Sequence, residues 1–147
     1  MKVIIIEDEK LSAEHLAVLL QKIDATIDVI NYFGTITASV AAFKEGLIAD
    51  LIFMDIHLAD GNSFEIFNQI QLEIPVIFTT AFDNYAIQAF KQNSIDYLLK
   101  PIALNDIQFA IEKFKKQQQL GNKELISSIA TAYQQMNKEY KTRFLVK

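Results

Sequence analysis

Short apolar runs alternate with amphipathic segments five times in the first 118 residues, and this alternation limits the chain to very few folds. The runs are too short for helices and rich in β-branched residues, which is typical of strands buried in a sheet; they lie at 3–6, 27–33, 51–54, 76–78 and 95–99. The segments between them repeat apolar residues at helical spacing. Strands that alternate with helices form a parallel sheet with helices on both faces. We therefore predict an α/β fold with a parallel five-stranded sheet.

The apolar character of each run predicts its place in the sheet. Runs 3–6 and 51–54 contain only apolar residues, so both are expected at the centre, whereas Asp28 and Asn31 in the second run indicate an edge strand. This favours the strand order 2-1-3-4-5, which is that of flavodoxin-like folds. The prediction is a flavodoxin-like (βα)5 three-layer sandwich with a C-terminal helical extension.

Five helices are expected after these strands, at 11–23, 36–47, 64–70, 85–90 and 104–114. Ser63 is expected to cap the third helix, and Asp83 or Asn84 the fourth, because short polar side chains accept hydrogen bonds from first-turn N–H groups. The apolar face of the last helix is expected to include Leu104, Ile107, Phe109, Ile111 and Phe114.

The bulk composition excludes several classes of protein. The net charge of -4 and pI of about 5.1 leave no basic footprint for nucleic acid. The chain has no Cys, so disulfides and thiolate metal sites are excluded, and a reducing compartment is favoured. No apolar stretch approaches the roughly 20 residues that a membrane span needs, and the N-terminal run is too short for a signal peptide. We expect a soluble cytoplasmic protein.

Polar side chains follow four of the five predicted strands at their carboxyl ends. They are Glu7, Asp8, Asp55, Thr80 and Lys100. In open α/β sheets the functional site lies beyond these strand ends, so we expect the five side chains to converge on one edge of the sheet.

This set of side chains predicts phosphoryl chemistry. Three clustered carboxylates repel one another and need a cation, and oxygen ligands favour Mg²⁺. Mg²⁺ and Lys100 together suit the oxygens of a phosphoryl group. No glycine-rich nucleotide-binding motif is present. Because a carboxylate can itself be the nucleophile, Asp55 is the candidate for an acyl phosphate.

Four stretches carry a resemblance to a known family: Ile-Glu-Asp-Glu at 6–9, Leu-Ile-Phe-Met-Asp-Ile-His-Leu at 51–58, Phe-Thr-Thr-Ala at 78–81 and Asp-Tyr-Leu-Leu-Lys-Pro-Ile at 96–102. In this order and spacing, residues 1–118 resemble a response-regulator receiver domain of two-component signalling. The resemblance implies a signalling switch, which takes a phosphoryl group from a sensor histidine kinase onto Asp55. It implies no metabolic enzyme, since such a domain catalyses only its own aspartyl phosphorylation and dephosphorylation.

The resemblance also implies a Mg²⁺ site beside Asp55. Asp8 matches the direct carboxylate ligand, Glu7 matches an acid that reaches the metal through water, and the backbone carbonyl of His57 matches a main-chain ligand. Ala59 departs from the family pattern, in which many members have proline before the Asp-Gly pair. This departure removes no chemical group from the site.

Three further residues match positions that respond to phosphorylation. Thr80 matches the switch hydroxyl, a choice over Thr79 that depends on the Thr-Ala pattern of the family. Lys100 matches the family's lysine, and its bond to Pro101 is expected to be cis. Tyr97 matches the aromatic switch position, with a core aromatic as its alternative role.

The tail differs in composition from the rest of the chain. Gly121-Asn122 is predicted to break the helix, and apolar residues recur at helical spacing over 125–136. We predict a linker helix at 119–140, with a frayed extension of the preceding helix as the alternative. Residues 141–147 resemble the start of a LytTR-type DNA-binding domain, so we expect that DNA is bound only through a missing C-terminal domain.

The resemblance leaves the output of the switch open. Residues 82–101 resemble receivers of the LytTR subfamily, which implies regulation of transcription. A homodimer through the fourth helix, fifth strand and fifth helix, near Tyr85, Ala89 and Phe90, is the expected active state. A stand-alone single-domain regulator is the alternative.

Two other classes of protein compete with a phosphorylated switch. A Mg²⁺-dependent phosphohydrolase with an aspartyl nucleophile usually has a second acid two residues later, where this chain has His57. A phosphorylation-independent interaction module would not need to keep Asp8, Asp55, Thr80 and Lys100 together.

Overall fold

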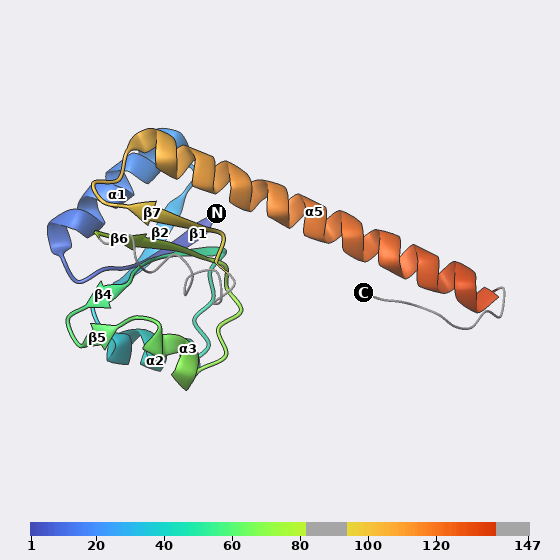
Figure 1. The fold of residues 1–147 in the computed structure, drawn as a ribbon, viewed down its shortest axis with the longest axis horizontal. Helices are drawn as coiled ribbons and strands as arrows, with labels where there is room; N and C mark the ends of the chain where they lie inside the picture. Colours follow the sequence, from blue (N-terminus) through green and yellow to red (C-terminus); the bar gives the residue numbers. More distant parts are fainter. Residues whose placement is uncertain (82–93, 138–147) are drawn as a thin grey trace. The chain divides into compact units, whose positions relative to one another are not determined.

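The computed structural model describes residues 1–81 and 94–137, with side chains up to residue 120. The chain divides into a unit of residues 1–111 and a unit of residues 112–147. The first unit contains a parallel sheet of five strands in the order β2-β1-β3-β6-β7 (Figure 1). The strands are β1 (Lys2–Ile6), β2 (Asp28–Phe33), β3 (Leu51–Asp55), β6 (Val76–Thr80) and β7 (Asp96–Leu99). This is the predicted order, with β2 at the edge, and it confirms the flavodoxin-like fold.

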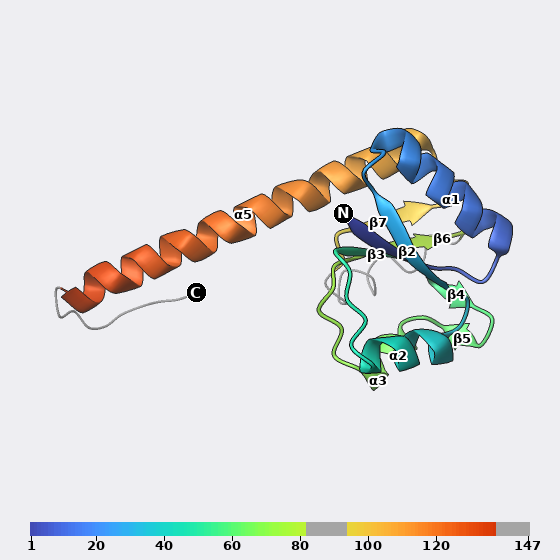
Figure 2. The same ribbon diagram turned by 180° about the vertical axis from the view of Figure 1, so that it is seen from behind.

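Helices cover both faces of this sheet, as expected for three layers. α1 (Lys10–Ile23) and the first turns of α5 (Leu104–Asn137) lie on one face, whereas α2 (Ile36–Lys44) and α3 (Glu65–Gln69) lie on the other (Figures 1 and 2). Within the described part of the chain, no helix is both long enough and apolar enough to cross a membrane.

The central strand β3 is buried along its whole length, which fits a run of four apolar residues that ends in Asp55. Alternate side chains point to opposite faces of a strand, so Ile52 and Met54 enter the cluster on the α2 side. The buried cluster consists of Ile4, Ile6, Ile36, Val40, Ile52, Met54, Ile56, Leu58, Ile66, Val76 and Phe78. Each such side chain contributes about 1.5–3 kcal/mol on burial. This packing holds the carboxyl ends of the strands in place.

A small antiparallel hairpin follows β3, and its two short strands were not predicted from the sequence. β4 (His57–Leu58) pairs with β5 (Gly61–Asn62), with His57 opposite Asn62. Gly61 has φ +140°, a conformation that only glycine adopts readily, and this explains the Asp-Gly turn signal in the sequence. The hairpin reverses the chain directly after Asp55.

Two predicted details of the helices are wrong. α3 begins at Glu65 with Phe64 as its N-cap, so Ser63 does not cap it. The Ser63 N–H instead donates to the Ile56 carbonyl at 2.7 Å, and its side chain is fully buried. In α5, Ile107 and Ile111 are buried, but Phe109 is 71% exposed. Phe109 lies about 200° around the helix from Ile107, because each residue turns the chain by about 100°.

The described part of the second unit is the continuation of α5, whose backbone is helical to Asn137. The helix passes through Gly121 and Asn122, so the predicted break there is wrong. Over residues 119–137 the predicted linker continues α5, and residues 138–140 lie outside the described part of the chain. One glycine inside a helix costs about 1 kcal/mol relative to alanine, which a long helix tolerates. The predicted helix at 85–90, with Asp83 or Asn84 as its cap, and the LytTR-like segment at 141–147 lie outside the described residues.

Candidate functional site

Three carboxylates converge at the carboxyl edge of the sheet, where the sequence predicts a site. Glu7 and Asp8 follow β1, and Asp55 is the last residue of β3. β1 and β3 are neighbours, with Ile6 opposite Met54, so their ends fall at the same edge. One ligand oxygen from each of the three acids lies within 4.8 Å of the others. Glu7 and Asp55 are buried, whereas Asp8 is exposed.

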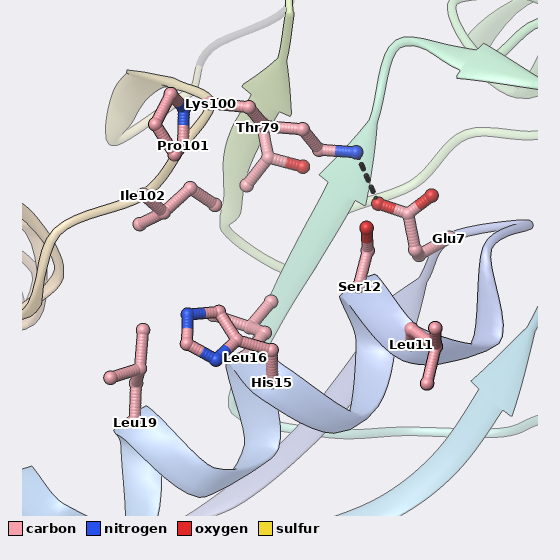
Figure 3. A pocket seen from close by; sticks show the side chains of 10 residues that line it. All are labelled: Glu7, Leu11, Ser12, His15, Leu16, Leu19, Thr79, Lys100, Pro101 and Ile102. Atoms are coloured by element: carbon pink, nitrogen blue, oxygen red, sulfur yellow. Dashed lines mark hydrogen bonds and ion pairs between the residues drawn. The ribbon is translucent and has the colours of Figure 1, made fainter.

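Lys100 brings a positive charge to these acids from the end of β7. Its Nζ lies 2.5 Å from Glu7 Oε1 and 2.9 Å from Asp55 Oδ2, and Figure 3 shows the contact with Glu7. Its main-chain N–H donates to the Thr80 carbonyl at 2.7 Å, which fixes the start of the loop after β7. The Lys100–Pro101 peptide bond is cis, as expected.

The pKa values of Glu7 and Lys100 show how the charges balance. Burial raises the pKa of Glu7 to about 7, although hydrogen bonds from Lys100 and the Glu9 N–H lower it. Burial acts to lower the pKa of Lys100, but its hydrogen bonds to Glu7 and Asp55 outweigh burial and raise it. One ammonium group among three carboxylates leaves negative charge, which a divalent cation would offset.

Without added metal, the protein should become less stable as pH rises from about 5 to 8. A raised pKa means that folded Glu7 binds its proton more tightly than unfolded Glu7. The stabilisation that comes from this tighter proton binding is complete below about pH 4.5 and is lost as pH rises through about 7. Glu7→Gln should therefore be more stable than wild type at pH 8 by about 1 kcal/mol, or several degrees in Tm. Thermal unfolding of wild type and Glu7→Gln in EDTA at pH 5 and pH 8 checks this. The same difference in Tm between the two proteins at both pH values would contradict it.

The family of the chain follows from comparison with known proteins. The sequence profile of the response regulator receiver domain matches residues 3–112, which is most of the chain. The chain belongs to the response-regulator receiver family. As a receiver domain of two-component systems, it is a signalling switch rather than a classical enzyme.

Curated relatives of this receiver domain include regulators named LytR and LytT. The chain is 36% identical over 126 residues to the sensory transduction protein LytR of Streptococcus agalactiae, covering 82% of the chain and 50% of that protein. It is 38% identical over 118 residues to the transcriptional regulatory protein LytR of Staphylococcus aureus, covering 78% and 47%. The chain thus spans about half the length of the curated relatives it matches.

A solved receiver structure supports the same assignment. The response regulatory domain of the protein mrkE from Klebsiella pneumoniae superposes with a TM-score of 0.70 at 27% identity. That match covers 82% of this chain and 99% of the mrkE domain.

The remaining predicted residues of the receiver domain lie on β6, on β7 and in the segment that follows Asp55. Thr79 pairs with Asp55 in register, and Thr80 is fully buried at the end of β6. The main-chain N–H of His57 donates to Asp55 Oδ1 at 3.2 Å, and the His57 side chain is exposed. Tyr97 is half-buried on β7 and packs against the buried cluster. The choice of Thr80 over Thr79, the role of the His57 carbonyl and the switching of Tyr97 stay predictions.

A groove of about 480 Å³ beside Glu7 and Lys100 was missed by the sequence analysis (Figure 3). One wall is α1, and the other is the loop after β7; the lining residues are Glu7, Leu11, Ser12, His15, Leu16, Leu19, Thr79, Lys100, Pro101 and Ile102. Leu11 is 81% exposed. The i, i+4 spacing of Leu11, His15 and Leu19 on one helix face was the available signal.

Proposed function

We propose that this receiver domain takes a phosphoryl group onto Asp55 from the phosphohistidine of a sensor histidine kinase. The observation that carries the proposal is the placement of Lys100 Nζ at 2.9 Å from Asp55 Oδ2, beside Glu7 and Asp8. An acid at the end of a fully buried strand is costly unless a positive charge compensates it. Here the compensating groups are also those that would bind phosphoryl oxygens.

The three acids fit a Mg²⁺ ion. The donor set contains only oxygen, and the exposure of Asp8 leaves room for the waters that Mg²⁺ keeps. Asp8 and Asp55 would hold the ion directly, Glu7 through water, and the His57 carbonyl would add a main-chain ligand. When bound, Mg²⁺ supplies positive charge that offsets the negative charge of phosphoryl oxygens.

The residues of the chain suit an in-line displacement. An Asp55 carboxylate oxygen forms a bond to phosphorus while the bond from phosphorus to the kinase imidazole nitrogen breaks, and the electron pair stays on that nitrogen. Lys100 stabilises the equatorial oxygens of the transferring group. The His57 N–H, which donates to Asp55 Oδ1, holds the carboxylate in its orientation.

The kinase needs a surface next to Asp55, and the groove along α1 offers one. Its walls carry exposed Leu11 and half-buried Ile102 on either side of a passage to Lys100 (Figure 3). An apolar helix of the kinase would cover Leu11 and place its phosphohistidine near Asp55.

Phosphorylation would then change the output face of the domain. The acyl phosphate adds negative charge and acceptor oxygens. Thr80 moves to bond one of these oxygens, and Tyr97 fills the space that Thr80 leaves, which biases an existing equilibrium. The expected result is a cytoplasmic homodimer through the predicted helix at 85–90, β7 and α5, which controls a LytTR-type DNA-binding domain and so regulates transcription.

Removing Mg²⁺ tests the proposal directly. Intact-mass spectrometry after incubation with acetyl phosphate and Mg²⁺ should show one added phosphoryl group per chain. EDTA in excess should reduce incorporation by at least about 10-fold, because the three acids then repel the incoming phosphoryl oxygens. Equal incorporation with and without EDTA would contradict the metal site.

The same experiment separates the two alternatives. A phosphohydrolase would release phosphate in many turnovers from the small donor, and a phosphorylation-independent module would incorporate none. His57 in place of a second acid after Asp55 argues against the hydrolase.

A further inference from the structure

Asp60 makes an unusual set of hydrogen bonds at the tip of the β4–β5 hairpin. Its Oδ1 accepts the main-chain N–H of Ile36 at 2.8 Å, and its Oδ2 accepts both the N–H and the hydroxyl of Thr37 at 3.2 Å. Ile36 lies 24 positions away in the sequence and begins α2. Thr35 accepts the Ala38 N–H at 3.0 Å, as a local cap would. Asp60 therefore completes the N-terminus of α2 from a distant loop.

The hairpin that carries Asp60 at its tip begins next to the proposed phosphorylation site. The hairpin starts at His57, two residues after Asp55, and the His57 N–H donates to the Asp55 carboxylate. Only Leu58 and Ala59 separate His57 from Asp60 at the hairpin tip. The bond to α2 therefore restrains the main chain around Asp55.

The chain segment that leads into α2, to which Asp60 binds, also contacts Glu7 and Asp8. Gly34 precedes the N-cap of α2 and lies beside Asp8: a β-carbon on Gly34 would be 3.6 Å from Asp8 Cα, which is an ordinary van der Waals contact. The Phe33 carbonyl, one residue earlier, accepts the Glu7 N–H at 2.8 Å. The chain segment that enters α2 is therefore fixed to the loop that carries Glu7 and Asp8.

The charge state of Asp60 strengthens this connection. The N–H of Ile36 above all, and then the groups of Thr37, hold the pKa of Asp60 below its usual value despite some desolvation. Asp60 is therefore ionised at neutral pH, and bonds to a charged acceptor are stronger than neutral ones. Negative charge at the first turn also suits the dipole of α2.

We propose that Asp60 is a positioning residue, which fixes the loop after Asp55 relative to the loop that carries Glu7 and Asp8. The proposal rests on the proposed Mg²⁺ and phosphoryl site. Asp60 acts through main chain: it holds the hairpin on α2, and α2 is held on the acidic loop. Without Asp60, the Asp55 and His57 ligand groups would occupy a wider range of positions, and a preorganised metal site would be lost.

Asp60→Ala is the main test, with Asp50→Ala as a matched control. Asp50 is also an exposed acid whose side chain accepts a main-chain N–H, from Lys2 at 2.7 Å, but it lies at the opposite end of the sheet. Calorimetric titration with Mg²⁺ should give about 10-fold weaker binding for Asp60→Ala and unchanged binding for Asp50→Ala. Asp60→Asn should fall between them, because its amide oxygen still accepts one N–H.

Phosphorylation gives a second readout that a merely structural loss would not reproduce. With acetyl phosphate, Asp60→Ala should incorporate phosphoryl groups about 10-fold more slowly at limiting Mg²⁺ and approach the wild-type rate at saturating Mg²⁺. Wild-type Mg²⁺ affinity in Asp60→Ala, or an equal loss in Asp50→Ala, would overturn the proposal. If Asp60→Ala does not fold, Asp60→Asn is judged by the same comparisons.

Amide hydrogen exchange separates this proposal from the proposed function. The Glu7 and His57 amides are both hydrogen-bonded at the site, and neither measurement needs Mg²⁺ or a phosphodonor. Both should exchange faster in Asp60→Ala than in Asp50→Ala, and unchanged exchange would refute the positioning role. A wild-type protein that takes no phosphoryl group would instead refute the proposed function, whatever the exchange rates show.

Discussion

Asp55→Asn should abolish phosphorylation by acetyl phosphate, with incorporation at least about 10³-fold below wild type. The amide of Asn is a far weaker nucleophile than a carboxylate and forms no stable phosphoryl adduct. The substitution preserves shape, and the single amide oxygen of Asn still accepts one of the two hydrogen bonds that Asp55 receives, from the His57 N–H on Oδ1 and from Lys100 Nζ on Oδ2. The loss would therefore report chemistry and not a damaged fold.

Asp50→Asn is the matched control for this prediction, because Asp50 precedes the same strand that Asp55 ends. It should incorporate one phosphoryl group at the wild-type rate. Intact-mass spectrometry gives the extent of modification, and circular dichroism checks that both variants fold. Phosphate retained on Asp55→Asn would move the acceptor to another side chain, which peptide mapping would identify.

The sheet could be predicted because its signals are local. The runs of 3–6 and 51–54 are wholly apolar, and a strand buried on both faces needs that composition. Their order then brings Glu7, Asp8 and Asp55 together without further information, since parallel strands end at the same edge. Lys100 joins them for the same reason, from β7.

Other features depend on contacts that a local pattern does not contain. The strands of the β4–β5 hairpin have two residues each and show no periodicity. The main-chain bond of Ser63 to Ile56 takes it into the core and leaves Phe64 as the cap of α3. The bonds of Asp60 to α2 join residues more than 20 positions apart.

The role of Glu7 shows the same limit for the site. The family resemblance implies a water-mediated contact of Glu7 with Mg²⁺, and nothing in the sequence indicates that Glu7 binds Lys100 directly at 2.5 Å. The adjacent acids Glu7 and Asp8 look equivalent in the sequence. Their difference comes from burial. Glu7 is buried and points toward Lys100 (Figure 3), whereas Asp8 is exposed.

Lys100→Ala should slow phosphorylation by about 100-fold and yet strengthen Mg²⁺ binding. The rate falls because the equatorial oxygens of the transferring phosphoryl group lose a positioned cation. Mg²⁺ binding strengthens because the Lys100 ammonium, which binds Glu7 and Asp55 in the wild type, no longer competes with the ion. Without this ammonium the acids also repel one another more strongly, which favours a bound cation. Calorimetric titration gives the affinity, and the initial rate with acetyl phosphate at saturating Mg²⁺ gives the chemistry.

The opposite signs of these two effects make the Lys100 experiment decisive. A variant that loosens the site, as we expect of Asp60→Ala, would weaken Mg²⁺ binding and regain its rate at saturating Mg²⁺. Lys44→Ala, which removes an exposed lysine at the end of α2, should change neither quantity. If Lys100→Ala bound Mg²⁺ more weakly than wild type, Lys100 would be a structural support for the acids, and the transferring phosphoryl group would need another source of positive charge.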